Sequence, residues 1–457
     1  MKPELYNYDV FPKVILAGKE NTITIKPLGI HAGINAGENY TLVITGLEEG
    51  DPALYPEWEC RSDLPVQADT DGYIRFSYTF PREEEYFLLL FRGNPEDDKL
   101  VMKESVYALA EDMKGRYPFR GDLHVHSCRS DGKEDPVMVC ANYRGFGYDF
   151  MIVSDHRRYY PSLDARKAYE GVAPSFNILP GEEVQLPLTD IHIINVGGDY
   201  SINALIDGNM NQKDRGDDPS VRSVNGKCPP VISREEYERQ IREIARADWF
   251  GAESANLSYA ACVWAFDRIR EAGGMGVFCH PYWRRKWAFQ VPEKFLSVML
   301  DNHPFDAFEV LGGERYFEHN GFQTVRYYEE TAAGVNFPIV GSTDTHGSTE
   351  HNIGGFICST IVFAPENTKD GLTSSIKDRY SVAVDTISKE FRLVGSLRLQ
   401  KYACFLMNCY FPLHDKLCNI EGQYMRQYAA GEEKAKARLD LIADDVTELM
   451  KKYIAVE

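Results

Sequence analysis

The chain has 457 residues, more than one ordinary hydrophobic core holds, so two or three domains are expected. Its formal net charge of −19 disfavours a nucleic acid duplex as a partner, because such a partner requires a basic face. No run of 18 apolar residues predicts a membrane span, and the start of the chain lacks the pattern of a secretory signal. The ten scattered cysteines form no C-x-x-C pair, which predicts reduced thiols in the cytoplasm.

Residues 1–112 have the pattern of β-strands. In residues 71–80, DGYIRFSYTF, an Asp-Gly turn precedes alternating apolar side chains that share one face from Ile74 to Phe80. Other alternating runs follow, separated by turns rich in Gly and Asp, and no convincing helix interrupts them. We therefore expect a β-sandwich with an accessory role.

Over residues 113–387, short apolar runs alternate with helical patterns, which predicts an α/β fold with parallel strands and crossover helices. A metal-capable residue ends one apolar run after another: YDFMIV leads to His156, GMGVFC to His280, and FPIV to Asp344. In α/β barrels the active site lies where the carboxyl ends of the strands converge. The pattern thus predicts a TIM-like barrel with its site at that end.

The segment GDLHVHSCRSDG, residues 121–132, opens this region. Since residues two apart on a strand share a face, His124 and His126 should both point inward. One histidine after a strand would be weak evidence, but nine imidazole and carboxylate side chains occupy such positions. They are His124, His126, Asp131, His156, Glu183, His192, His280, Asp344 and His346. Ligands of these two types suit zinc, manganese or iron.

The motifs resemble those of the PHP (polymerase and histidinol phosphatase) family of metal-dependent phosphoesterases. DLHVHSCRSDG, VSDH, PGEEV, DIHIINV, FCHPYW and STDTHG occur in the family's order, over about residues 120–364. The resemblance implies a distorted (β/α)7 barrel that holds three divalent metal ions.

The resemblance also implies which residues bind each ion. The first ion would take His124, His126, Glu183 and Asp344; the second would share Glu183 and take His192 and His280; the third would take Asp131, His156 and His346. Glu182 is the alternative to Glu183, and Asp190 could compete with His192. Asp155 is expected to orient a ligand.

The expected reaction is hydrolysis of a small phosphate ester by a metal-bound hydroxide at this trinuclear site. Glu183, Asp344 and His280 are the expected catalytic residues. No cysteine nucleophile is required, and Cys279 and Cys128 are interpreted as core residues, Cys279 by strand alternation.

Arginines near the motifs could bind phosphate oxygens, because a guanidinium matches their geometry. Arg129, Arg157 and Arg284 are the predicted substrate-binding residues, and Tyr282, Trp283 and Trp287 are candidates for an aromatic wall.

Two other functions stay open. The layout, with a β domain before the barrel, is similar to that of carbaryl hydrolase-like enzymes of the PHP type, which implies a carbamate or carboxyl-ester hydrolase on the same site. A non-catalytic PHP module is the third reading.

Two further regions complete the organisation. Residues 200–256 form a long insertion between the strand bearing His192 and the helix leading to His280, and are expected to border the pocket. Residues 388–457 predict a helical appendage, with apolar residues from Leu439 to Tyr453 on one helical face. It would cover the barrel or form the contact of a homo-oligomer.

Overall fold

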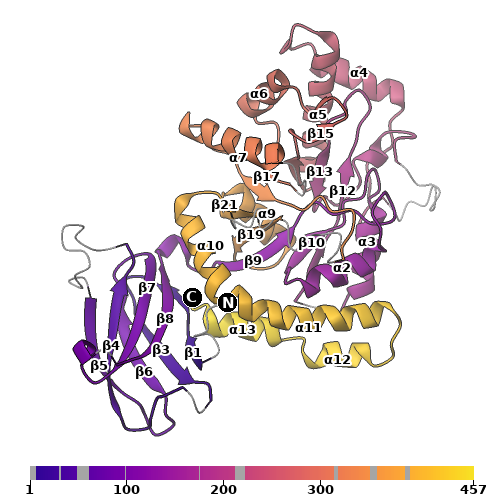
Figure 1. Ribbon diagram of the computed structural model, residues 1–457. Helices are drawn as coiled ribbons and strands as arrows, with labels where there is room; N and C mark the ends of the chain where they lie inside the picture. Colours follow the sequence, from indigo (N-terminus) through magenta and orange to yellow (C-terminus); the bar gives the residue numbers. More distant parts are fainter. Residues whose placement is uncertain are drawn as a thin grey trace. The chain divides into compact units, whose positions relative to one another are not determined.

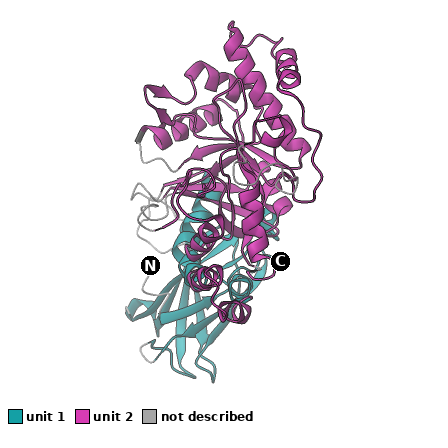
Figure 2. Ribbon diagram, turned by 90° about the vertical axis from the view of Figure 1, so that its right-hand side faces the viewer, with its two compact units in different colours: residues 1–117, 397–417, 444–457 teal, residues 118–396, 418–443 magenta. Residues whose placement is uncertain are grey.

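The computed structural model divides the chain into two compact units (Figure 2). Unit 1 comprises residues 1–117, 397–417 and 444–457, and unit 2 comprises residues 118–396 and 418–443. The structure describes residues 7–29, 32–48, 61–97, 99–173, 175–210, 222–312, 317–349, 358–385 and 392–457. The C-terminal helices are shared between the units, and the domain borders at residues 112 and 387 stay predictions.

Unit 1 contains two β-sheets that enclose one apolar core. The three-stranded sheet has the order β1-β3-β6 (Tyr8–Phe11, Glu20–Pro27, Ile74–Thr79), and the five-stranded sheet has the order β2-β8-β7-β4-β5 (Val14–Leu16, Leu100–Leu109, Glu84–Arg92, Asn39–Gly46, Arg61–Gln67). Neighbouring strands are antiparallel in the three-stranded sheet, whose Ile23 and Ile74 share a core with Leu42 and Leu88 of the other sheet. The predicted sandwich is therefore present, and Ile74, Phe76 and Phe80 are buried as the alternation requires.

The C-terminal segment of unit 1 packs on the five-stranded sheet. Tyr402 of α10 (Leu397–Cys409) stacks on Tyr107 of β8 with ring centroids 5.1 Å apart. After α13 (Asp445–Tyr453), the backbone of Ala455 donates a hydrogen bond to Val14 at 2.8 Å.

The single helical face predicted from Leu439 to Tyr453 is wrong. The helix breaks between α12 (Ala435–Leu441) and α13. Leu439 is buried in a core cluster of unit 2, whereas Tyr453 belongs to unit 1. One continuous helical face does not form, because Leu439 and Tyr453 are buried in different cores.

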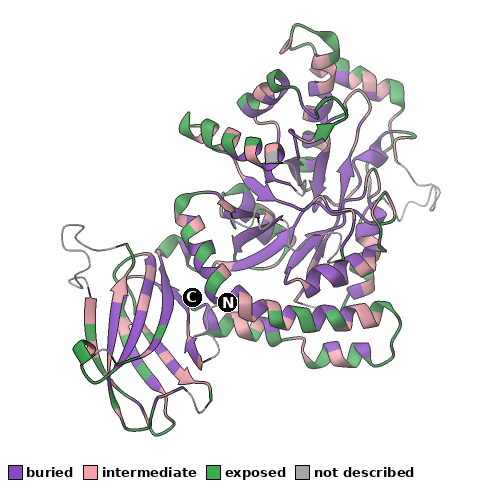
Figure 3. Cartoon of the chain, viewed as in Figure 1, coloured by how far each residue is buried: buried purple, intermediate pink, exposed green. Residues whose placement is uncertain are grey.

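Unit 2 contains two large sheets, most of whose strand residues are buried (Figures 1 and 3), and an exposed two-stranded hairpin of β15 (Arg284–Arg285) and β16 (Ala288–Phe289). The six-stranded sheet has the order β11-β10-β9-β19-β20-β21 (Asn177–Leu179, Phe150–Ile152, Tyr117–Asp122, Cys358–Ala364, Ser381–Asp385, Arg392–Val394). The five-stranded sheet has the order β12-β13-β14-β17-β18 (Gly181–Val184, Ile193–Val196, Met275–Phe278, Ala307–Leu311, Ile339–Gly341). Strands buried on both faces are typical of sheets covered by helices.

The prediction of parallel strands holds for only part of unit 2. β9, β10 and β11 are parallel, as are β14, β17 and β18. In contrast, β13 runs antiparallel to both β12 and β14, and β20 is antiparallel to β19. Residues 185–192, which join β12 to β13, are too few for a crossover helix, so the chain turns back on itself.

Isolated backbone bridges link the two sheets. Val125 pairs with Thr345, and His156 pairs with Glu183. Both bridges lie just beyond strands that carry predicted ligands, so the sheets converge there. These bridges do not amount to a continuous closed ladder, and the closed seven-stranded barrel stays a prediction.

Helices separate most of these strands along the chain. They are α2 (Pro136–Gly145), α3 (Tyr160–Tyr169), α4 (Arg234–Ile244), α5 (Glu253–Glu271), α6 (Glu293–Asn302), α7 (Phe317–Ala332) and α9 (Lys369–Lys377), and α11 (Phe411–Ala429) follows near the C-terminus. None of the helices among the described residues is long and apolar enough to cross a membrane.

Local side-chain and backbone geometry defines the start of α4 and the end of α5. The Ser233 hydroxyl caps α4 by accepting from the Glu236 backbone at 3.2 Å, but the Glu236 side chain bonds Arg239 and Gln240 instead of completing a capping box. α5 ends before Gly273, whose φ of 71° suits glycine at a helix terminus.

A buried ionic network attaches α11 to α2. The Arg144 guanidinium lies 2.8 Å from Glu421 and 3.0 Å from Asp149, and all three side chains are almost inaccessible to solvent. Next along α11, Gly422 approaches Gly145 so closely that a Cβ there would lie 2.2 Å from the Gly145 nitrogen. The part of α11 from Cys418 onward is therefore an integral part of unit 2, whereas the helix begins in unit 1.

This network predicts the effect of removing one partner. Glu421→Ala should lower the free energy of unfolding by about 3 kcal/mol, because Arg144 then keeps a buried charge that is only partly compensated. Urea denaturation followed by circular dichroism measures the change. Glu433→Ala, at an exposed position, is the control, and equal stability of the two variants would contradict the interpretation.

Candidate metal centre

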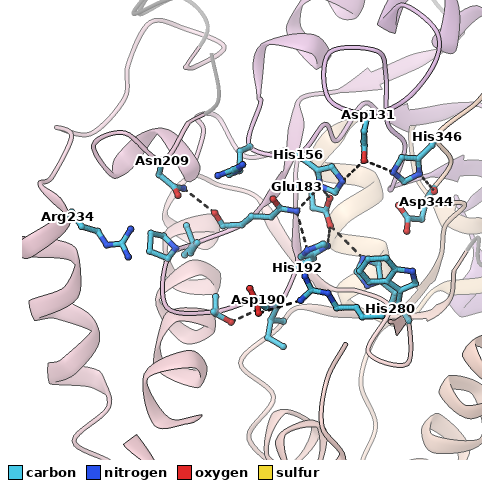
Figure 4. Close-up of a pocket in the computed structure, with 18 residues that line it drawn as sticks. Asp131, His156, Glu183, Asp190, His192, Asn209, Arg234, His280, Asp344 and His346 are labelled. Carbon is cyan, nitrogen blue, oxygen red and sulfur yellow. Dashed lines mark hydrogen bonds and ion pairs between the residues drawn. The ribbon is translucent and has the colours of Figure 1, made fainter. Parts of the chain in front are cut away.

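All nine predicted ligands converge at one end of the sheets of unit 2, and Figure 4 shows the seven of them that line a pocket there. His124 and His126 follow β9, His156 follows β10, and His280 follows β14. His192 precedes β13, but since β13 is antiparallel, its start meets the ends of β12 and β14: Ile193 pairs with both Val184 and Phe278. The reversal of β13 is what brings His192 to the centre.

The first predicted ion set is closely grouped. His124 Nε2 and His126 Nε2 lie 3.1 Å and 3.0 Å from Asp344 Oδ1. The same two nitrogens lie 3.8 Å and 3.7 Å from the oxygens of Glu183. These four side chains share one small volume.

The residues predicted to bind the second and third ions also lie close together. His192 Nδ1 and His280 Nε2 lie 2.6 Å and 3.6 Å from Glu183 Oε1. Asp131 Oδ2 lies 3.4 Å from His156 Nε2 and 3.3 Å from His346 Nε2. His156 also contacts Glu183 through Nδ1, so the second and third sets adjoin.

Unsatisfied buried atoms indicate that this cluster suits metal ions. Glu183 is fully buried, and its two carboxylate oxygens are paired with imidazole nitrogens, among them His192 Nδ1 at 2.6 Å. The buried ring nitrogens His126 Nδ1 and His280 Nδ1 have no hydrogen-bond partner within the described residues. Buried polar atoms without partners are costly, and imidazole and carboxylate groups are the ligands that zinc, manganese and iron accept. The residues present therefore fit divalent ions.

The electrostatics of the cluster are dominated by attraction between carboxylates and imidazoles. Burial lowers the pKa of His124, but Asp344 and Glu309 outweigh it and raise this pKa to about 10. For His156, burial is likewise outweighed by Glu183, and the pKa rises to about 11. Burial alone would raise the pKa of Glu183, yet His192 and His156 hold it well below its usual value. A divalent ion would take the place of these protons.

The backbone is strained at the cluster. His280 and Asp344 have φ angles of 30° and 46°, and Arg157, next to His156, has a φ of 52°. Non-glycine residues in this region cost of the order of 1–3 kcal/mol each and persist where the surroundings fix them, commonly at functional sites.

Glu309 was not predicted, although it contacts two ligands. This fully buried residue of β17 places Oε2 3.0 Å from His124 Nδ1 and accepts a hydrogen bond of 3.3 Å from the backbone of His280. A carboxylate on one ring nitrogen fixes the tautomer and directs the other nitrogen toward a metal. The available signal was a single charged residue within the apolar strand AFEVL.

The structure distinguishes among the acidic alternatives. Glu182 accepts hydrogen bonds from Ser201 and Ile202, away from the cluster, which favours Glu183 as the ligand. Asp190 is exposed and pairs with Arg285 at 3.4 Å. Asp155 orients no ligand ring; it accepts from the Ser127 and Ser130 hydroxyls and so holds the loop that carries Asp131.

The two cysteine predictions need correction. Cys279 is buried as expected, but its sulfur lies within 4.8 Å of ring nitrogens of both His124 and His280 rather than on the opposite face. The strained φ of His280 interrupts the regular alternation on which the prediction relied. Cys128 is exposed rather than part of the core.

A pocket of about 560 Å³ opens over the cluster. Arg157 lines it as predicted, but Arg129 and Arg284 do not. These two instead pair with Asp135 at 3.0 Å and Glu318 at 3.1 Å, at exposed positions. Sequence proximity to a ligand thus failed to place them, because each loop turns its arginine toward a nearby carboxylate.

Two other arginines and one of the three aromatic residues line the pocket. Arg234 begins α4, and Arg285 lies on the hairpin of β15 (Arg284–Arg285) and β16 (Ala288–Phe289). Trp283 forms part of the wall, with its ring centroid 5.7 Å from that of His280. Tyr282 is buried and bonds Glu293, and Trp287 is 96% exposed.

The described parts of the 200–256 insertion border this pocket through Asn209 and Arg234. Residues 211–221, the middle of the segment expected to restrict access, lie outside the described residues.

Comparisons with known proteins were made at three levels. No family model matches the chain, and no curated protein matches it. Among solved structures, a two-domain protein from Bacteroides vulgatus ATCC 8482 containing a predicted PHP-like metal-dependent phosphoesterase has 18% identity and a TM-score of 0.37. That match covers 59% of this chain and 65% of the other, just under two thirds of its length.

Two further solved structures are similar over about half of this chain. A candidate metal-dependent phosphoesterase from Bifidobacterium adolescentis ATCC 15703 has 16% identity, a TM-score of 0.31, and coverage of 51% and 89%. An amidohydrolase from Chromobacterium violaceum, with bound sulfate and no metal, has 17% identity, a TM-score of 0.30, and coverage of 50% and 88%. Structural similarity at these identities and TM-scores carries no argument about the function of this chain.

Glu309 provides a test of how the cluster is organised. Glu309→Gln should weaken metal affinity by about 10- to 100-fold, since the amide can no longer hold the His124 ring as a carboxylate does. Titration of the metal-free protein with Zn²⁺ by calorimetry gives the affinity. Glu329→Gln, an exposed change on α7, should bind as the unaltered protein does. Equal affinity of both variants would remove Glu309 from the site.

Proposed function

We propose that the chain is a metal-dependent hydrolase that cleaves a small phosphate ester. The observation that carries this proposal is the convergence of nine imidazole and carboxylate side chains around Glu183 at the base of a pocket. A structural role for such a cluster is disfavoured, because it crowds imidazoles and carboxylates in a buried volume and leaves ring nitrogens of His126 and His280 without hydrogen-bond partners among the described residues.

The proposed ligand sets follow the three groups of contacts. One ion is held by His124, His126 and Asp344, a second by His192 and His280, and a third by Asp131, His156 and His346, with Glu183 shared between the first two. Bound zinc, manganese or iron would supply an activated water and neutralise charge on the phosphoryl oxygens. Together with these ligand sets, we propose that unit 2 has the (β/α)7 barrel arrangement of the PHP type.

The chain's own residues position the ester. Glu183, Asp344 and His280 are proposed as the catalytic residues, since they lie at the inner end of the pocket. Arg157 points its guanidinium at the non-bridging oxygens of the phosphate, where a planar fork of donors matches their spacing. Trp283 packs against the leaving group and excludes water from that side.

A carbamate or carboxyl ester is the second candidate. Leu186, Pro187 and Ile191 give the pocket an apolar wall that accepts an uncharged leaving group. The same metal site would serve that reaction, so the substrate has to be settled by assay.

Metal content tests the proposed centre. The reconstituted protein should hold about two to three divalent ions per chain, and Glu183→Ala should lower hydrolysis of p-nitrophenyl phosphate by about 10³-fold or more. His124→Ala should be less damaging, since only Glu183 is shared between two ions. Elemental analysis and steady-state kinetics give both quantities.

The control is His303→Asn, outside the cluster at a left-handed position that Asn tolerates. A reconstituted protein with no more than one ion per chain would contradict the shared-carboxylate arrangement.

A substrate panel tests the reaction class. We expect p-nitrophenyl phosphate to be hydrolysed faster than bis-p-nitrophenyl phosphate and 1-naphthyl carbamate, because Arg157 and the ions favour a dianionic phosphate. Preference for the carbamate would replace the phosphoesterase by the second candidate. Metal binding without hydrolysis of any of the three would favour a non-catalytic module.

A further inference from the structure

The pocket extends well beyond the metal centre. In Figure 4, Arg234 lies on the opposite side of the pocket from Asp344 and His346, with Asn209 and His192 between them. An inorganic phosphate or a methyl ester would occupy only the inner end of a cavity of about 560 Å³. The outer end is therefore available to the rest of a substrate.

The outer end is positively charged. Apart from the proposed ligands, the charged residues among the described pocket lining are Arg157, Arg234, Arg285 and Asp190. With Arg157 next to the ligand His156, two arginines and one aspartate remain for the rest of the described lining, a net positive charge on a chain that carries −19 overall. A local reversal of sign of this kind selects for anions.

Two of these arginines can exchange their present partners for a ligand. Arg234 pairs with Glu238 at 2.9 Å, and Arg285 pairs with Asp190 at 3.4 Å, and all four side chains are partly or largely exposed. Exposed ion pairs contribute little to stability, so an entering anion displaces them at small cost.

Arg157 is placed differently. It directly follows the ligand His156, its backbone donates to Glu183 at 3.0 Å, and its guanidinium makes no hydrogen bond or ion pair to the described residues. This arginine is assigned to the phosphate at the metal centre, which leaves Arg234 and Arg285 without a role in cleavage.

The described lining mixes polar and apolar side chains. Leu186, Pro187, Ile191 and Trp283 supply its aliphatic and aromatic surface, beside polar residues such as Asn209. A ring or short hydrocarbon body would pack on it while its two ends met the ions and the outer arginines. The pocket thus has the layout of a site for a molecule with two anionic ends.

We infer that the substrate is a phosphate ester whose leaving group carries a second anionic group, a carboxylate or a phosphate, bound by Arg234 and Arg285. The inference rests on the proposed phosphoesterase function and names the class of ester that it takes. Arg234 and Arg285 determine specificity and act on binding rather than on bond cleavage.

A set of matched esters tests this. Phenyl phosphates bearing a 4-carboxymethyl, a 4-phosphonomethyl or an uncharged 4-carbamoylmethyl group have similar shapes and differ in charge at the far end. The metal-loaded protein should cleave each charged ester with a kcat/KM about tenfold above that of the amide, mainly through KM, as expected for a charge-assisted contact. The charged ester with the larger advantage identifies the anion as carboxylate or phosphate.

Substitutions of the two arginines test whether they cause the preference for charged esters. Arg234→Ala and Arg285→Ala should each reduce the ratio of charged to uncharged kcat/KM, and the double variant should bring it close to one. Arg239→Ala, on the same helix but paired with Glu236 outside the pocket, should keep the ratio of the unaltered protein.

The possible failures are distinguishable. Hydrolysis of all three esters with equal kcat/KM overturns the second anion site and leaves the phosphoesterase in place. A ratio that survives the double variant overturns the assignment to these arginines. Absence of hydrolysis of all three esters by metal-loaded protein overturns the proposed function and this inference with it.

Discussion

The site depends on one buried carboxylate. Glu183 is inaccessible to solvent, and its two oxygens lie against five imidazoles. A buried charge is tolerated only with opposite charge beside it. The histidines supply that charge when protonated, and divalent ions would supply it more fully. The cluster is therefore best understood as a receptacle for cations, and its neighbours as the means of holding that carboxylate in place.

The order and direction of the strands bring the histidines to Glu183. β13 reverses direction, so that His192 enters from the start of a strand while Glu183 and His280 lie at or beyond the ends of their strands. Glu309, one strand further, holds the ring of His124 and the backbone of His280. The positive φ angles of His280 and Asp344 show that the backbone is held away from its relaxed conformation at two of the ligands.

Much of the candidate site could be predicted from the sequence, and the reason is physical. Histidines two residues apart on a strand must share a face, and side chains at the ends of adjacent strands must converge, so the nine candidate ligands could be expected to meet at one place, and the PHP resemblance then implied how they divide among three ions. Residues that are close to the site in space but distant from the motifs in the sequence could not be predicted. In the sequence, Glu309 is only a single charged residue in an apolar strand. The loops that carry Arg129 and Arg284 direct these side chains toward nearby carboxylates. Arg234 lines the pocket from a helix that is distant in the sequence. The helix break after Leu441 also depends on which core each end joins.

Anomalous diffraction from crystals of the metal-loaded protein, measured on both sides of the metal absorption edge, tests the central claim most directly. The account predicts two peaks about 3.5–4 Å apart with the Glu183 carboxylate between them, and a third beside Asp131, His156 and His346. A single peak, or peaks that leave Glu183 uncoordinated, would contradict it.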